Sequence, residues 1–158
     1  MSDNAAHNSL WRTFDWFFVV ALVLGAGLQF VMPLSFTPPV WPLVLQVGGS
    51  AALIVGMALI FAARRQLARS DQPAKPGIAT TELIEDGVFA LSRNPIYLGG
   101  VLFSAGLSMV FDAPWLAPTT AGLAMATHYF LILPEEHYLG VRFKARYGDY
   151  RGRVRRWF

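Results

Sequence analysis

Four long runs without a charged residue constrain the fold of this chain more than any other feature. They are Trp16–Met32, Val40–Ala63, Ile96–Phe111 and Ala113–Pro134, and none of them contains Asp, Glu, Lys or Arg. A helix that crosses the hydrocarbon core of a bilayer needs about 20 mainly apolar residues, within a range of ~17–25. Three of the runs reach that length alone, and the Ile96–Phe111 run reaches it with its flanking residues. Each run therefore predicts a transmembrane helix.

The runs and the segments between them predict an all-α fold: a polytopic membrane protein with four transmembrane helices and a cytoplasmic interfacial C-terminal helix. We expect one integral-membrane domain over residues 1–158. The transmembrane helices are predicted at 14–32, 43–63, 95–111 and 114–133, and the interfacial helix at 135–150. Apolar and aromatic side chains recur in this last segment at helical spacing, with basic residues between them, as in an amphipathic helix at a membrane surface.

Local signals predict where two of these helices end. Arg64-Arg65 are expected to end the second helix, and Pro134 is expected to end the fourth helix and begin the interfacial one. Along the second helix, small residues recur at spacings that let two membrane helices approach closely. They are Gly48, Gly49, Ala51, Ala52 and Gly56. Packing against another helix is the expected role of this stripe.

Composition supports the membrane assignment, because 54% of the residues are hydrophobic. The formal net charge of +3 could suggest a nucleic-acid partner, but the segregation of the charges into loops favours contact with anionic lipid. The chain has no cysteine. Disulfides, thiolate metal ligands and a cysteine nucleophile are therefore excluded, and no cluster of His and carboxylate residues suggests a metal.

The basic residues predict the topology. All 13 Lys and Arg lie in the N-terminal segment, in the 64–94 loop or in the C-terminal region, and neither outer connection has any. Because basic residues accumulate on the cytoplasmic side, both termini and the long loop are expected in the cytoplasm. Four tail arginines are expected to anchor the chain on anionic lipid, and the alternative is that they close the substrate entrance. They are Arg151, Arg153, Arg155 and Arg156.

Residues 92–100, Ser-Arg-Asn-Pro-Ile-Tyr-Leu-Gly-Gly, mark the start of the third predicted helix. Asn94 is a good N-cap, and Pro95 suits the first helical position, where no amide donor is needed. Such a helix start attracts anions, and Arg93 adds positive charge beside it. Gly99 and Gly100 leave the helix surface bare for a flat ligand or for another helix. The alternative is that Arg93 marks the membrane edge and the glycines only serve packing.

Two adjacent carboxylates should lie at the same depth as Asn94, because the third and fourth helices form an antiparallel hairpin. These are Glu135 and Glu136, and together with the helix start they suit a zwitterion such as the amino-acid part of a cofactor. Favourable placement of acidic groups in a first helical turn is the simpler explanation. His128 lies seven residues before Glu135, on the same face of an α-helix, and either serves function or bonds a neighbouring helix.

An ordered set of motifs in the C-terminal half resembles a known family. It consists of Thr81-x-Leu83, Gly87-x-Phe89, residues 93–99, Glu135-Glu136, and then Leu139, Phe143, Tyr147 and Tyr150. It is similar to the integral-membrane methyltransferases that include isoprenylcysteine carboxyl methyltransferase and the phospholipid N-methyltransferases. The first two helices are similar to that family only in hydropathy.

The resemblance implies S-adenosylmethionine as the cofactor and a lipophilic or amphiphilic methyl acceptor at the cytoplasmic membrane face. The resemblance implies that the cofactor-binding residues are Arg93, Asn94, Pro95, Tyr97, Gly99, Glu135 and Glu136. Substrate-facing positions are expected at His128, Arg142, Tyr147 and Tyr150. Two residues depart from the family pattern. Asn94 stands where better-studied relatives have histidine, and Lys144 stands where a glycine often follows the phenylalanine.

The sequence assigns no catalytic residue. A carboxylate acceptor needs no base, whereas an amine acceptor needs one, and Glu135, Glu136 and His128 are the candidates. Carboxylate and amine acceptors both fit these residues, and the sequence leaves the oligomeric state open. A non-catalytic membrane scaffold is the alternative function. It would account for the glycines and the basic tail, but not for the ordered cytoplasmic motifs.

Overall fold

The computed structural model describes residues 14–36, 42–70 and 82–157, and every regular element in these ranges is a helix. The long elements are α1 (Phe14–Val31), α2 (Pro42–Arg69), α3 (Pro95–Val110), α4 (Leu116–Thr127) and α5 (Leu133–Arg153). A 3₁₀ turn, η2 (Gly87–Ala90), precedes α3, and a π-helical segment, η3 (His128–Ile132), joins α4 to α5. The predicted all-α fold is confirmed.

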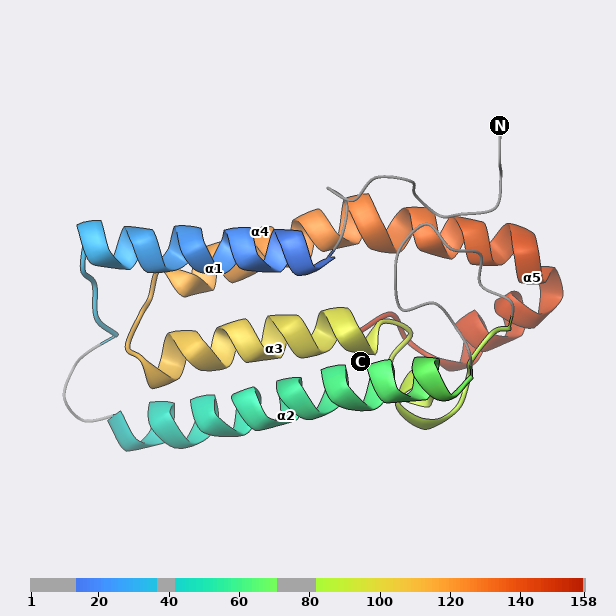
Figure 1. Ribbon diagram of the computed structural model, residues 1–158, viewed down its shortest axis with the longest axis horizontal. Coiled ribbons are helices and arrows are strands. Elements are labelled where there is room, and N and C mark those ends of the chain that lie inside the picture. Colours follow the sequence, from blue (N-terminus) through green and yellow to red (C-terminus); the bar gives the residue numbers. More distant parts are fainter. Residues whose placement is uncertain (1–13, 37–41, 71–81, 158) are drawn as a thin grey trace.

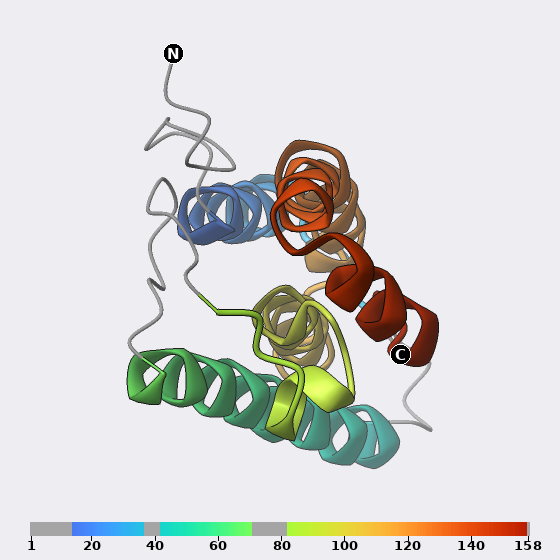
Figure 2. The same ribbon diagram turned by 90° about the vertical axis from the view of Figure 1, so that its right-hand side faces the viewer.

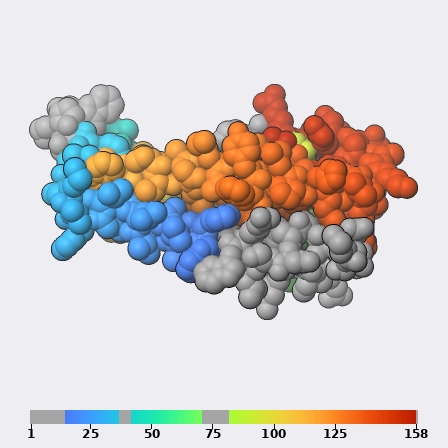
Figure 3. Space-filling model, turned by 90° about the horizontal axis from the view of Figure 1, so that it is seen from above, coloured from blue at the N-terminus to red at the C-terminus, as the bar shows by residue number. Residues whose placement is uncertain are grey.

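The long helices lie side by side with α3 at the centre. In Figure 1, α1 and α4 lie on one side of α3 and α2 lies on the other. The main packing partner of α2 is α3, and that of α1 is α4. Figure 2 shows the same bundle from one end, with α1 and α2 separated on one flank of α3. Figure 3 shows the continuous α4–α5 helix extending past the beginning of α1.

Two helices of the described chain are long and apolar enough to cross a membrane. They are α2 and the continuous 38-residue helix Leu116–Arg153, whose apolar, charge-free part is residues 116–133. The helices α1 and α3 are also apolar but shorter. The prediction of four membrane crossings is therefore consistent with the helices and stays a prediction.

Glycines allow α2 and α3 to pack closely, as the small residues of the second helix predicted. A Cβ added at Gly56 would lie 2.5 Å from the carbonyl oxygen of Gly99, and one added at Gly99 would lie 2.6 Å from that of Gly56. Gly49 and Gly106 face each other in the same way one heptad away on each helix. Side chains larger than hydrogen would force the two antiparallel backbones apart.

The prediction that Arg64-Arg65 end the second helix was wrong, because α2 continues to Arg69. Its last turns have a partner in the following segment, since Gln66 Nε2 donates to the carbonyl oxygen and to the side chain of Asp86, at 2.9 and 2.6 Å. Two adjacent arginines end the part of a helix that can lie in the membrane. They do not end the helix itself, because arginine is a good helix former.

The prediction that Pro134 ends the fourth helix was also wrong. The chain passes through Pro134 as a helix, because a π-turn forms just before it: the Leu133 amide donates to the carbonyl oxygen of His128, five residues earlier. A wider turn accommodates the missing proline amide and its bulky ring. The bend comes later, at Lys144, where φ is 46° and ψ is −118°. The interfacial helix predicted at 135–150 is thus the continuation of the α4 helix, and it is kinked.

At the end of the bundle where α3 begins, the segment that follows Thr81 packs against the second half of α5. Thr81 itself lies outside the described residues. Leu83 shares a buried cluster with Tyr147, Tyr150 and Val154, and the Tyr150 hydroxyl donates to the carbonyl oxygen of Phe89 at 2.7 Å. This packing fixes residues 82–91 beside the start of α3, where the candidate site lies.

Candidate functional site

An ion-pair network joins the start of α3 to the start of α5. Arg93 Nη1 lies 3.1 Å from Glu136 Oε1, and the two side chains are only 9% and 10% exposed. Arg156 from the tail contacts the same carboxylate with two nitrogens, Nε and Nη2, each at 2.8 Å. A bidentate guanidinium–carboxylate contact is both strong and directional. Glu136 is therefore held between two arginines from distant parts of the chain.

The network sets the protonation state of Glu136. Burial would raise the pKa of its carboxyl, but the hydrogen bonds from Arg156 and the charges of Arg93 and Arg156 outweigh burial and lower this pKa below its usual value of 4.5. Glu136 is therefore ionised at neutral pH. Its two oxygens are occupied by arginine nitrogens, so it is a poor acceptor for a ligand as long as Arg156 stays in place.

The backbone of the tail also binds the segment before α3. The Arg93 amide donates to the carbonyl oxygen of Arg155 at 3.0 Å. The Ser92 hydroxyl and the Asn94 Nδ2 both donate to the carbonyl oxygen of Arg156, at 3.1 and 3.2 Å. The predicted capping role of the Asn94 side chain was wrong, because it makes no hydrogen bond to the first amides of α3. Pro95 does stand in the first turn of α3, as predicted.

The second carboxylate has a different partner. The Tyr97 hydroxyl donates to Glu135 Oε2 at 3.1 Å, which joins the first turn of α3 to the first turn of α5. Adjacent residues of an α-helix point about 100° apart, so Glu135 faces Tyr97 while Glu136 faces the arginines. Burial raises the pKa of the Glu135 carboxyl, with the Tyr97 hydrogen bond opposing it and the Glu136 charge adding to it.

The structure brings some of the predicted residues together and leaves others apart. Tyr147 joins the network, because its hydroxyl accepts from Arg93 Nη1 at 3.5 Å. Burial and the charge of Glu136 raise the pKa of this hydroxyl. Tyr150 is used instead to bond Phe89, and Arg142 is exposed beside the Phe143 ring. Gly99 turns its bare side to Gly56 on α2, so a helix fills the space that a flat ligand could have used.

His128 and Glu135 are seven residues apart, a spacing that would place them on the same face of a regular α-helix. In the structure they do not share a face. The π-turn between them adds a residue to one turn, which rotates the two positions by about 100° relative to the α-helical register. The His128 ring instead packs edge-on against Tyr129, with their centroids 5.0 Å apart. Pro134 is the signal in the sequence from which this change of register could have been anticipated.

Sequence reasoning missed Ser92 and Arg156 as parts of the site. The tail arginines were predicted to be lipid anchors. In the structure two of them pair with carboxylates, Arg156 with Glu136 and Arg153 with Glu85 at 2.7 Å, and the anchoring role stays a prediction. Glu85 also accepts from Arg146 at 2.7 Å. Nothing in the spacing of the four arginines distinguishes Arg156 from its exposed neighbour Arg155. The fold makes that distinction by turning the tail back onto residues 92–94.

Comparison with known proteins identifies the family. Residues 44–146, well over half of the chain, match the phospholipid methyltransferase family. The chain belongs to this phospholipid methyltransferase family. No curated protein and no solved structure matches the chain.

Membership of the phospholipid methyltransferase family has direct implications for function. The family is related to the isoprenylcysteine carboxyl methyltransferases, as the motifs indicated, and it implies S-adenosylmethionine-dependent methylation of a lipid. The matched range runs from α2 to the kinked part of α5 and includes Arg93, Tyr97, Glu135 and Glu136. It leaves out α1 and the tail with Arg156. The contact that closes the network is therefore supplied from outside the matched range.

The polar groups at this end of the bundle fit an S-adenosylmethionine molecule. Its amino-acid part carries a carboxylate and an ammonium group, and its ribose carries hydroxyls. Arg93 Nε is a buried donor that has no hydrogen-bond partner among the described residues, which suits a carboxylate. Glu135 offers a carboxylate oxygen that no arginine of the described ranges contacts, which suits an ammonium group or a hydroxyl.

Proposed function

We propose that this protein is a single-domain integral-membrane methyltransferase that transfers a methyl group from S-adenosylmethionine to an amphiphilic lipid at the cytoplasmic membrane face. Four helices span the membrane, and both termini lie in the cytoplasm. The family supports the reaction class, and the one-sided distribution of Lys and Arg supports the topology. The observation that carries the site is the convergence of Tyr97, Glu135 and the Arg93–Glu136 pair at one end of α3 and α5.

Each residue of the proposed cofactor site has its own role. Arg93 binds the carboxylate of the cofactor through Nε, and Glu135 accepts from its ammonium group or ribose hydroxyls. Glu136 holds Arg93 in position, and Asn94 holds the tail against the site. Pro95 begins α3 there, and Gly99 keeps α3 close to α2. Tyr97 orients the Glu135 carboxylate.

S-Adenosylmethionine, when bound, supplies an electrophilic methyl group on a positively charged sulfur. What remains for the protein is to hold the acceptor within reach and in line, because alignment is the main requirement of such a displacement. A carboxylate acceptor needs no further help. An amine acceptor must first lose its proton, and Glu135 is the best-placed group to take it, because its carboxylate is not engaged by an arginine.

Calorimetric titration of S-adenosylhomocysteine in detergent tests the cofactor site. Glu135→Gln is expected to weaken binding, because one charge-assisted hydrogen bond contributes about 1.5–3 kcal/mol, or roughly a ten- to hundredfold change in affinity. Asn94→Ala and Glu136→Gln should weaken it as well, by loosening the tail and Arg93. Asp149→Asn, an exposed carboxylate of α5, is the matched control and should bind like the wild type.

The possible outcomes distinguish a wrongly assigned cofactor site from a wrong function. Unchanged affinity in all three variants, with folding intact, would show that the cofactor binds elsewhere. No binding to the wild-type protein would contradict the methyltransferase function and favour the scaffold. Transfer of a labelled methyl group to lipid amines or to lipid carboxylates then identifies the acceptor.

A further inference from the structure

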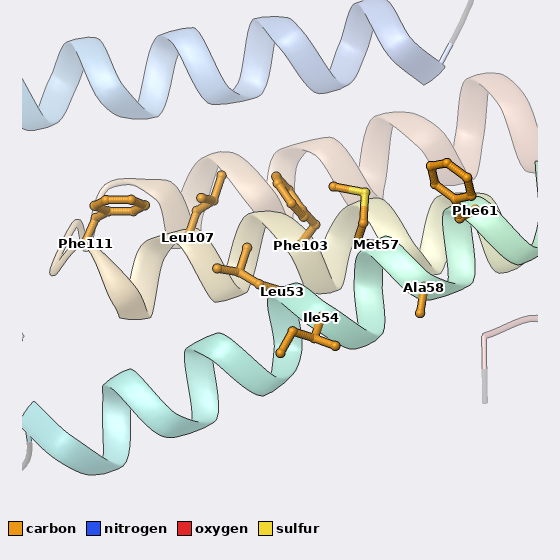
Figure 4. Close-up of a pocket in the computed structure, with 8 residues that line it drawn as sticks. All are labelled: Leu53, Ile54, Met57, Ala58, Phe61, Phe103, Leu107 and Phe111. Carbon is orange, nitrogen blue, oxygen red and sulfur yellow. The ribbon is translucent and has the colours of Figure 1, made fainter.

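An apolar groove runs along α2 and α3, away from the polar end of the bundle. Its volume is about 680 Å³, within the range of roughly 300–1,000 Å³ that is typical of pockets for small ligands. The side chains that matter here are Leu53, Met57 and Phe61 from α2 and Phe103, Leu107 and Phe111 from α3. Figure 4 shows them spaced along the two helices over most of the length of α3. The groove is long and its lining carries no charge, which suits a hydrocarbon chain.

The groove lies where the bundle is open. Because α1 packs on α4 and α2 packs on α3, the two outer helices are not each other's main partners, and Figure 2 shows them apart on one flank of α3. Phe103 of the groove also contacts Phe18 of α1, with ring centroids 6.0 Å apart. The groove is therefore beside the opening between α1 and α2, with α3 as its floor. A chain could enter it sideways from the membrane.

An ion pair bridges this opening at the cytoplasmic end. Arg64 Nη2 of α2 lies 2.8 Å from Asp15 Oδ1 of α1, and both side chains are more than half exposed, at 51% and 72%. In the topology proposed above, the pair offers one positive and one negative group at the depth of a lipid headgroup. Those charges complement a phosphate and an ammonium group, which are the charged parts of a zwitterionic phospholipid.

The middle of the groove, at Phe103, is connected through α1 to the proposed reaction site. Phe18, which contacts Phe103, packs against the same buried cluster as Tyr97, formed by Ala21, Leu123 and Leu131. Asp15 lies one turn before Phe18 on α1, and Tyr97 lies in the first turn of α3. A lipid with its chain in the groove would therefore place its headgroup between the Asp15–Arg64 pair and the Tyr97–Glu135 pair.

We propose that the α2–α3 groove binds one acyl chain of the phospholipid substrate, with Asp15 and Arg64 receiving its headgroup. This inference rests on the proposed function, and it adds the groove that holds the acyl chain, the entry side between α1 and α2, and the residues that select chain length. Met57 lies near the headgroup end of the groove, whereas Leu107 lies further along it. A bulky residue at Met57 should exclude every chain, and one at Leu107 should exclude only long chains.

The experiment uses a phosphatidylethanolamine with a photoactivatable acyl chain, added to the purified full-length protein in detergent. Labelling of peptides from α2 and α3 is measured with and without an excess of unlabelled phospholipid. Met57→Trp is expected to lower the competed labelling about tenfold or more, because filling the groove removes the apolar surface that a chain would bury. Val55→Trp is the matched control: Val55 is 49% exposed and Met57 is 46% exposed, but Val55 does not line the groove.

A second variant tests the direction of the chain. Leu107→Trp should reduce labelling by a long-chain probe and leave labelling by a short-chain probe with the same headgroup unchanged. Equal labelling of the Met57→Trp and Val55→Trp proteins, or labelling that excess phospholipid does not reduce, would overturn the proposal and assign the groove to bulk lipid. A shift from dimer to monomer in Met57→Trp without loss of labelling would overturn it as well, because the groove would then be an interface between copies.

The readout is independent of methyl transfer. Specific labelling that Met57→Trp abolishes in a protein without methyltransferase activity would support the groove and contradict the proposed function. Activity on phospholipid with no specific labelling of α2 and α3 would support the function and contradict the groove.

Discussion

Arg93 Nη1 lies 3.1 Å from Glu136 Oε1, and this buried contact joins the residue just before the N-cap of α3 to the first turn of α5, some forty residues later in the chain. The pair also has a third member, because Arg156 binds the same carboxylate with two nitrogens. Removing one partner of a buried pair leaves the other charge without compensation, which costs far more than losing a surface pair. The stability of this end of the bundle should therefore depend on Arg156, which lies beyond the end of α5.

Replacing Arg156 tests that dependence. Arg156→Gln is expected to destabilise the protein by about 1.5–3 kcal/mol, because it removes the bidentate contact and leaves Glu136 with Arg93 alone. Arg155→Gln is the matched control, since the Arg155 side chain is exposed and only its backbone holds Arg93. Thermal unfolding in one detergent compares the two. Equal midpoints for both variants would show that the tail contact contributes nothing to stability.

The pH dependence of stability should reveal the ionised state of Glu136. Its pKa is lower in the folded protein than the usual value of 4.5, so its contribution to stability is fully present above that value. The contribution is lost as the pH falls through the lower, folded-state pKa. Thermal midpoints measured from neutral to acidic pH should thus fall less steeply in Glu136→Gln than in the wild type. Parallel curves for the two proteins would contradict the assignment.

Lys144 adopts a backbone conformation that glycine adopts more easily, with φ at 46°. Lys144→Gly should therefore stabilise the protein or leave its stability unchanged, although glycine usually destabilises a helix. The strain relieved is of order 1–3 kcal/mol, against a glycine cost of roughly 0.5–1 kcal/mol. Ala145→Gly, at the next residue, is the control and should destabilise by about 1 kcal/mol. Thermal unfolding distinguishes them, and a larger loss for Lys144→Gly would refute the strained kink.

Cysteine labelling tests the four crossings and the cytoplasmic termini. The chain has no cysteine, so single substitutions at Leu34 and Ala68, which are both exposed, report their own side of the membrane. An impermeant thiol reagent should label Leu34→Cys from outside intact cells and Ala68→Cys only after the membrane is opened, because the Lys and Arg residues lie on the Ala68 side. Labelling of both positions from one side would exclude a membrane crossing by α2.

Much of the site could be anticipated because its signals are local. The place of Pro95 in a first helical turn could be predicted from the chemistry of that one residue. The structure confirms that α3 begins there. The neighbourhood of Tyr97 and Glu135 followed from two apolar runs joined by a short connection. Asn94 shows the limit of such reasoning, because its capping preference is real but its amide bonds the tail instead. The side chain donates through Nδ2 to a distant carbonyl oxygen, and its Oδ1 accepts no hydrogen bond from the local amides.

By itself, the sequence determined that this chain is all-helical, that its apolar runs are membrane candidates and that its polar motifs gather at one end. These properties follow from periodicity, composition and family motifs, which act over a few residues or a single helix. Only the tertiary structure decided that the helix passes through Pro134 by a π-turn, that Gly99 faces Gly56 and not a ligand, and that Arg156 closes on Glu136. Each of these depends on which surfaces meet, and a guanidinium in an exposed tail has no local preference for one carboxylate until packing brings the two together.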